Sequence, residues 1–222
     1  MRQTAAVMQP YFFPYAGYFR LLAQADVFVI LDSVQQRKGG RVHRCEVPAA
    51  RGGCEWLTLP LRPCSVNTRI SDLRFAADAD ATWRQRLARH RWIAAGQGDA
   101  ACAVREFLCA PLGTHVVDLL EAGLALVAGL LGIDTEIVRS SDLAIDTALR
   151  GSQRVLAIVE SLGARRYLNA PGGRALYEPA DFAQRGIELS FCTDYRGPHR
   201  YLLHDLMCGP LAPLRSDVLG EA

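Results

Sequence analysis

Hydrophobic positions at the start of the chain alternate between a strand pattern and a helical pattern. Short apolar stretches at residues 4–10 and 26–32 are typical of buried β-strands, and Pro10 ends the first of them. Between them, residues 17–25 repeat apolar side chains on one face of a helix. The chain therefore opens with a predicted strand, loop, helix and strand, and residues 9–18 form the first loop.

The rest of the chain adds further predicted strands and helices. The pattern predicts strands at residues 55–61, 70–75, 135–143, 166–170 and 187–191. It predicts helices at residues 83–95, 115–132 and 151–163, the last with Ser152 as its N-cap and Gly163 as its stop. Because strands and helices alternate at both ends, we expect an α/β fold with a mostly parallel sheet and helices on both faces. No repeat or linker interrupts residues 1–222, so we expect a single domain.

Composition and charge narrow the possible functions. A net charge of +2 gives no electrostatic sign of nucleic-acid binding. The longest charge-free apolar run, residues 122–133, is too short to span a hydrocarbon core of roughly 30 Å. Pro10 and Pro14 interrupt the start of the chain, so we expect no signal peptide and a cytoplasmic protein. The seven cysteines include no CxxC pair, so no metal site is predicted, and the sequence points to no particular cofactor.

The first predicted loop is rich in aromatic residues. Residues 8–19 read MQPYFFPYAGYF, with six aromatic rings in twelve positions. Ligands of open α/β sheets bind in the loops beyond the carboxyl ends of the strands, so this loop is a candidate binding loop. We expect its phenylalanines to pack in the core. The candidate substrate-binding residues are those with polar groups and the glycine that allows close approach: Gln9, Tyr11, Tyr15, Gly17 and Tyr18.

This strand, loop, helix and strand also resemble the opening βαβ unit of nucleotidylyltransferases, in which the loop ends in His-x-Gly-His. The corresponding residues here are Tyr15, Ala16, Gly17 and Tyr18. Neither tyrosine can supply the imidazolium that would stabilise a transferring phosphate. The resemblance therefore predicts the fold of this unit and does not predict nucleotidyl transfer.

A second group of polar residues follows the second predicted strand. Asp32 ends that strand, and Gln35, Lys38, His43 and Arg44 follow in the next loop. A carboxylate, an amide and three basic groups suit an anionic, planar ligand. The alternative is a solvated loop beside a capping aspartate.

A third candidate loop follows the predicted strand at residues 166–170. Asn169 can bind a hydroxyl or an amide, and the backbone at Gly172 and Gly173 can approach a phosphate or carboxylate closely. The alternative is a tight turn that holds no ligand.

Histidines supply the remaining candidates for proton transfer. His199 and His204 lie near Asp205, but His204 and Asp205 are consecutive and should point apart on a helix. His90 lies among arginines in a predicted helix, which is either a phosphate clamp or a solvated face. The candidate catalytic residues are therefore Asp32, His43, His199 and His204, and His90 and Asp205 are candidate substrate-binding residues.

Several longer motifs are spread over nearly the whole chain. They are MQPYFFPYAGYF at residues 8–19, VQQRK at 34–38, WLTLP at 56–60, LGIDTEIVRSSDL at 131–143 and LGARRYLNAPGGRALY at 162–177. In these motifs the chain resembles the WbqC-like protein family. The resemblance implies a bacterial protein of surface-polysaccharide (O-antigen) or secondary-metabolite assembly, and it adds Tyr177, the last residue of the last motif, to the candidate substrate-binding residues.

We therefore predict a biosynthetic transferase or amide-forming ligase. Its small-molecule substrate would be an activated metabolite, either an amino-sugar nucleotide or an amino-acid derivative. The aromatic loop would hold a base or sugar, the basic groups would hold phosphate or carboxylate, and Asp32 or a histidine would take the proton. The alternatives are a non-catalytic ligand-binding or assembly partner of a biosynthetic enzyme, and a hydrolase of an activated intermediate.

Overall fold

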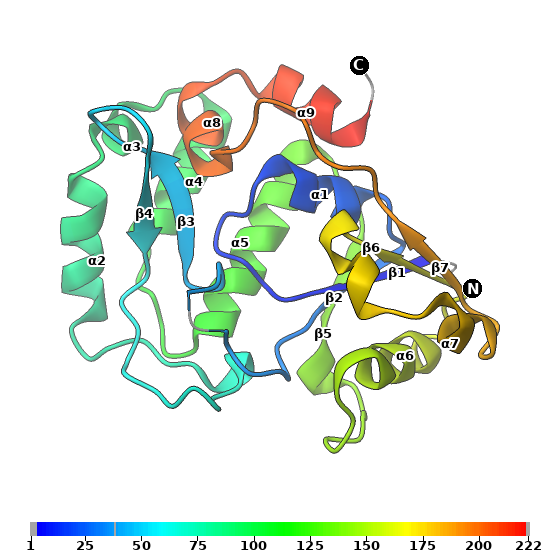
Figure 1. Cartoon of the computed structure of the whole chain (residues 1–222). Coiled ribbons are helices and arrows are strands. Elements are labelled where there is room, and N and C mark those ends of the chain that lie inside the picture. Colours follow the sequence, from blue (N-terminus) through cyan, green and yellow to red (C-terminus); the bar gives the residue numbers. More distant parts are fainter. Residues whose placement is uncertain (1–3, 38, 221–222) are drawn as a thin grey trace.

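A five-stranded parallel sheet forms the centre of the molecule (Figure 1). The computed structural model describes residues 4–37 and 39–220, so Lys38, a predicted anion-binding residue, lies outside the described residues. The strands are β1 (Thr4–Met8), β2 (Val27–Ile30), β5 (Glu136–Arg139), β6 (Arg166–Asn169) and β7 (Glu188–Phe191). They lie in the order β5-β2-β1-β6-β7, and every neighbouring pair is parallel. The prediction of an α/β fold with a mostly parallel sheet is confirmed.

The strand order determines where a ligand is expected. Counted along the chain, the order is third, second, first, fourth, fifth, which is typical of doubly wound sheets and compatible with a nucleotidylyltransferase-like opening unit. Successive strands are added on one side of β1 up to β5 and on its other side from β6 onward, so the direction of strand addition reverses between β1 and β6. Because Ala6 pairs with Leu168 in parallel register, the aromatic loop after β1 and the loop after β6 open at the same edge. Ligands of such sheets bind at this edge, beside the reversal.

Helices cover both faces of the sheet, as predicted (Figure 1). The alternating side chains of the strands divide into two hydrophobic clusters, with Phe28 in one and Val29 in the other. The first cluster packs against α1 (Ala16–Ala23), α5 (Val116–Leu131) and α9 (Leu211–Leu219). The second packs against α6 (Gly151–Ser161) and α7 (Pro179–Ala183).

A hairpin and four more helices lie beside α5, away from the sheet (Figure 1). The hairpin pairs β3 (Arg44–Pro48) with β4 (Cys54–Thr58). The helices are α2 (Ala79–Ala88), α3 (Arg91–Ala95), α4 (Asp99–Cys109) and α8 (Leu202–Cys208). The cluster that contains Phe28 of the sheet also contains Leu57 of the hairpin and Trp83 of α2, so a continuous core joins the two parts.

Three local predictions are wrong. Residues 70–75 are no strand: they contain the 3₁₀ turn η1 (Ile70–Asp72), whose first N–H groups bond to the carbonyls of Val34 and Asp32. The helix predicted at 83–95 divides into α2 and α3, because His90 between them has non-helical backbone angles. Arg150, and not Ser152, is the N-cap of α6.

The predicted stop of α6 is confirmed, since Gly163 has a φ of 65°, a conformation that favours glycine. Two further 3₁₀ turns, η2 (Ser140–Asp142) and η3 (Pro171–Leu176), follow β5 and β6 at the carboxyl edge. In the described part of the chain, no helix has the length and apolar character needed to cross a bilayer.

Candidate functional site

The phenylalanines of the aromatic loop pack in the core. Phe12 and Phe13 are buried, and their rings contact each other edge to face at 5.1 Å between centroids. Phe12 also packs against Trp83 of α2, and Phe13 against Phe107 of α4. The loop therefore fastens the sheet to the outer helices, as expected for its phenylalanines.

The backbone of this loop is strained at one residue. Phe13 has a φ of 41°, the only positive φ outside glycine in the described chain. For a bulky side chain this conformation costs about 1–3 kcal/mol. It persists because the Phe13 ring is buried and because the preceding N–H, of Phe12, bonds to the carbonyl of Arg41 at 3.1 Å.

Tyr18, one of the predicted substrate-binding residues, is buried in the core. Its side chain is 2% exposed, and its hydroxyl donates a hydrogen bond of 2.9 Å to the backbone carbonyl of Gln9. Burial raises the pKa of this phenol well above its ordinary value. Both the ring and the hydroxyl of Tyr18 are used inside the protein, which argues against its predicted role in substrate binding.

Tyr11 and Tyr15 remain partly exposed, and burial raises the pKa of both phenols. The Tyr15 ring packs against Tyr195 with 5.8 Å between centroids. A Cβ added at Gly17 would lie 2.6 Å from the Cβ of Tyr195, so the packing of Tyr195 requires this glycine. The roles of Gln9, Tyr11 and Tyr15 in substrate binding stay predictions.

Asp32 links the carboxyl ends of β2 and β5 through hydrogen bonds. Its carboxylate is 0% exposed and accepts three hydrogen bonds: from the Ser140 hydroxyl at 2.9 Å, the Ser141 N–H at 2.9 Å and the Ser141 hydroxyl at 2.6 Å. These bonds connect the end of β2 to the 3₁₀ turn after β5. A general acid or base must reach its substrate, and this carboxylate is enclosed by its partners. Catalysis by Asp32 stays a prediction.

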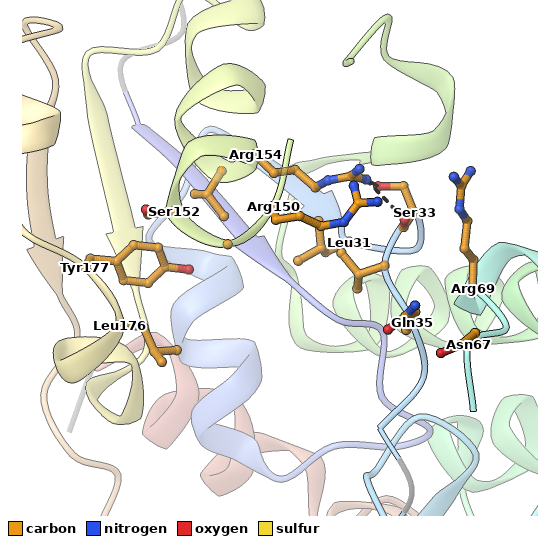
Figure 2. Close-up of a pocket in the computed structure, with 13 residues that line it drawn as sticks. Leu31, Ser33, Gln35, Asn67, Arg69, Arg150, Ser152, Arg154, Leu176 and Tyr177 are labelled. Carbon is orange, nitrogen blue, oxygen red and sulfur yellow. Dashed lines mark hydrogen bonds between the residues drawn. The ribbon is translucent and has the colours of Figure 1, made fainter. Parts of the chain in front are cut away.

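A cavity of about 570 Å³ lies at the carboxyl edge of the sheet (Figure 2). We call it the α6 cavity, because the first turn of α6 forms one wall. The segments after β2 and β6, the two neighbours of β1, form two further walls, and residues 67–69 form the fourth. This volume is in the range of small-molecule sites, and the position is the one expected from the strand order.

Of the predicted site residues that the structure describes, Gln35 and Tyr177 line the α6 cavity. Sequence reasoning missed its other polar residues, which are Ser33, Asn67, Arg69, Arg150, Ser152 and Arg154. The predicted helix at residues 151–163 could have indicated some of these residues. In a parallel sheet a helix that crosses to the next strand begins at the carboxyl edge, so the first turn of the predicted helix at residues 151–163 had to lie there.

Three guanidinium groups give the α6 cavity its positive charge. Within the described residues, neither Arg69, Arg150 nor Arg154 forms an ion pair with a carboxylate. The pKa of Arg154 is lowered by burial and by the charges of Arg150 and Arg69, which Asp146 only partly opposes. The α6 N-terminus has no side-chain cap, and its N–H groups add positive potential. An anion bound here would relieve this repulsion.

Arg154 is held in place by the protein. It donates hydrogen bonds to the carbonyls of Ser33, Thr147 and Leu149 at 3.0 to 3.1 Å, and to the Ser33 hydroxyl at 2.9 Å. Ser33 in turn contacts the Ser140 hydroxyl at 2.9 Å, and Ser140 bonds to Asp32. The buried carboxylate is thus connected to the cavity wall. Arg69 and Arg150 are exposed, so they are the cations that a ligand can reach.

Asn169 and the two glycines after it form a tight turn. The Asn169 side chain is buried, and its oxygen accepts the N–H of Ala170 at 2.8 Å. A Cβ at Gly173 would lie 2.2 Å from the amide nitrogen of Asn169, which explains this glycine without a ligand. Gly172 is exposed, with open space where a Cβ would be. These geometries favour the alternative of a turn, and a binding role stays a prediction.

The predicted histidines lie away from the α6 cavity. His199 contacts Asp205 through Nδ1 at 3.2 Å, while His204 packs against Trp92. As expected, then, His204 and Asp205 form no dyad; the partner of Asp205 is His199. Burial raises the pKa of Asp205. His90 is buried beside Trp92, so it is neither a solvated residue nor part of the cavity.

Arg44 is engaged at the hairpin. It begins β3, its guanidinium lies 4.1 Å from the centroid of the Trp56 ring, and it donates to the carbonyls of Gly39 and Gly40. Its predicted contact with an anion stays a prediction. Among the residues that the structure describes, no three His, Cys, Asp or Glu side chains gather as a metal site, and the seven cysteines are unpaired.

Comparison with known proteins assigns the family. The model of the WbqC-like protein family matches residues 9–202. The chain belongs to this family. It is also 26% identical over 202 residues to "Uncharacterized protein Rv1507c" of Mycobacterium tuberculosis, which covers 90% of this chain and 85% of the relative. No solved structure matches the chain. The matched range of this WbqC-like protein includes the aromatic loop and every residue that lines the α6 cavity.

His43 gives this WbqC-like protein a testable pH dependence. Its Nδ1 lies 2.8 Å from the Gln36 amide nitrogen, and burial and the charge of Arg44 lower its pKa. Burial also lowers the pKa of His90. As the pH falls below about 6.5, the unfolded chain therefore takes up these protons before the folded chain does.

We expect the free energy of unfolding, measured with urea, to fall as the pH is lowered from 7.5 to 5.5. His43→Asn should make this fall shallower, because the amide oxygen can replace Nδ1 as the acceptor and does not titrate. His115→Asn, at the start of α5, is the matched control. An equal pH slope in wild type and His43→Asn would contradict the assignment.

Proposed function

We propose that this WbqC-like protein is a cytoplasmic bacterial enzyme that binds a small, anionic, activated metabolite in the α6 cavity. Its reaction would be the transfer or amide formation expected in surface-polysaccharide or secondary-metabolite assembly. The observation that carries the proposal is the cavity at the carboxyl edge whose three guanidinium groups form no ion pair with a described carboxylate. The family membership supports the biosynthetic context.

The residues of the cavity suggest how each part of the ligand is held. Arg69 and Arg150 would bind a phosphate or carboxylate through charge-assisted hydrogen bonds, with the free N–H groups of the α6 N-terminus nearby. The amides of Gln35 and Asn67 can orient polar groups of the ligand. The same guanidinium groups would stabilise negative charge that develops on a leaving group.

A second candidate function is ligand binding without catalysis. Among the residues that the structure describes, those that line the α6 cavity include no histidine, aspartate, glutamate, lysine or cysteine. A proton acceptor for amide formation would therefore have to come from the ligand or from another part of the chain. This observation favours a binding partner of a biosynthetic enzyme, and a turnover assay separates the two functions.

The anion site can be tested with paired arginine variants. We expect Arg69→Gln/Arg150→Gln to unfold within about 0.5 kcal/mol of wild type, because both side chains are exposed. A charge-assisted hydrogen bond contributes about 1.5–3 kcal/mol, so the double variant should bind at least tenfold more weakly. Calorimetry would use ligands found by a thermal-shift screen of nucleotides, nucleotide sugars, acyl phosphates and amino acids.

Arg84→Gln, an exposed arginine on α2, is the matched control and should bind as wild type. If the double variant binds as well as the control, the ligand does not occupy the α6 cavity and the proposal fails. If binding is lost but wild type forms no product from any bound donor with amine acceptors, the non-catalytic function replaces the enzymatic one.

A further inference from the structure

The α6 cavity differs in chemistry between its two ends. In Figure 2, Arg69, Asn67 and Gln35 lie at one end, while Leu176 and Tyr177 lie at the other, with Ser152 beside them. Arg150 lies between the two ends, and the apolar side chain of Leu31 lies near the middle. A ligand that spans the cavity therefore meets cations and amides at one end and a hydrocarbon and an aromatic ring at the other.

Leu176 is unusually exposed for a leucine side chain. It is 69% exposed, and in the described chain only Trp56 and Val66 are also exposed large hydrophobic residues. Single exposed hydrophobic residues are common, and they need no function by themselves. Leu176 differs from the other two because it lines the α6 cavity, where a ligand can cover it.

Tyr177 adds a polar group to the apolar end. The Tyr167 hydroxyl, which lies in the core beneath, donates toward the Tyr177 oxygen at 3.3 Å. The Tyr177 hydroxyl therefore serves as acceptor for Tyr167 and keeps its own hydrogen to donate. In Figure 2 this hydroxyl points toward the middle of the cavity. It can bind a carbonyl or ester oxygen between the two ends of a ligand.

We propose that the ligand of the α6 cavity is an anion that carries an apolar acyl or aryl group. Its phosphate or carboxylate binds Arg69 and Arg150, and its apolar group packs against Leu176 and Tyr177. This inference rests on the proposed function and narrows its substrate class. Of the activated metabolites considered, it selects an apolar acyl or amino-acid derivative over a sugar nucleotide, because a sugar would leave hydroxyls against hydrocarbon.

The experiment measures the binding of four phosphates by calorimetry: inorganic phosphate, glucose 1-phosphate, phenyl phosphate and hexyl phosphate. We expect wild type to bind the phenyl and hexyl esters at least tenfold more tightly than glucose 1-phosphate. Leu176→Ser should weaken hexyl phosphate roughly tenfold by exposing its chain, and should leave inorganic phosphate unchanged. Val66→Ser removes an equally exposed apolar side chain outside the cavity lining and should change neither.

The first two outcomes below test the apolar subsite separately from the proposed function, and the third tests both together. If Arg69→Gln/Arg150→Gln abolishes binding of all four phosphates while Leu176→Ser has no effect, the apolar subsite is wrong and the anion site stands. If glucose 1-phosphate binds as tightly as phenyl phosphate, the selected substrate class is wrong. If wild type binds none of the four, both the subsite and the anion site are overturned.

Discussion

Phe12→Ala is expected to lower the free energy of unfolding by about 3–5 kcal/mol, the usual cost of removing a buried phenylalanine ring. Phe12 is 3% exposed and contacts Phe13 and Trp83, so its loss leaves a cavity between the sheet and α2. For a chain of this length the melting temperature should fall by roughly 10 °C. Urea unfolding followed by tryptophan fluorescence and circular dichroism measures both the stability and the loss of packing around Trp83.

Tyr15→Phe, in the same loop, is the matched control. It keeps the ring that packs against Tyr195 and removes one partly exposed hydroxyl, so its stability should stay within about 0.5 kcal/mol of wild type. If Phe12→Ala is as stable as Tyr15→Phe, the aromatic loop does not fasten the sheet to the helices. Tyr18→Phe should fall between the two, because it deprives the Gln9 carbonyl of a buried donor.

Asp32→Ala is expected to lower the free energy of unfolding by at least about 3 kcal/mol. Three donors from Ser140 and Ser141 lose a carboxylate acceptor that is itself fully buried. Asp32→Asn keeps the shape and one oxygen, so we expect a smaller loss. Asp142→Ala removes an exposed carboxylate from the same 3₁₀ turn and should be close to neutral. Urea denaturation at pH 7.5 compares the three variants.

The two roles considered for Asp32 lead to different results. If Asp32→Ala unfolds like Asp142→Ala, the hydrogen bonds to Ser140 and Ser141 do not hold the strand ends together. If Asp32→Asn keeps its stability and binds ligand normally but loses turnover, the predicted catalytic role of Asp32 is supported. A loss of stability together with weaker ligand binding fits the chain of contacts from Asp32 through Ser140 and Ser33 to Arg154.

Much of the sheet could be predicted because its strands are short, apolar and separated by clear turns. β1 and β2 are buried along almost their whole length, so their apolar runs were reliable signals. Residues 70–75 misled the prediction, because their alternating pattern serves a 3₁₀ turn whose N–H groups bond to the segment after β2. β3 was missed, because its inward residues Cys45 and Val47 alternate with polar ones over only five positions.

The candidate site was harder to predict, because its residues come from segments far apart in the sequence. Arg69 and Arg150 line the same cavity because β2 and β6 lie on either side of β1 in the sheet. The periodicity of hydrophobic residues does not determine this strand order. Tyr18, in contrast, was predicted to belong to the site although it is buried. A phenol suggested exposure, but a backbone carbonyl from the same loop satisfies its hydroxyl inside the core. Such a local partner is visible only when the path of the chain is known.

The position of β1 in the middle of the sheet also constrains how the protein can be made. Val27, the β2 partner of Ala5, is synthesised about 20 residues after it, but Tyr167, the β6 partner of Ala5, is synthesised about 160 residues after it. Until β6 is synthesised, the edge of β1 that pairs with it has no hydrogen-bonding partner. An unpaired edge of an apolar strand promotes aggregation. The nascent chain must therefore keep this edge shielded while the hairpin and the helices up to α6 emerge from the ribosome. High contact order of this kind slows folding.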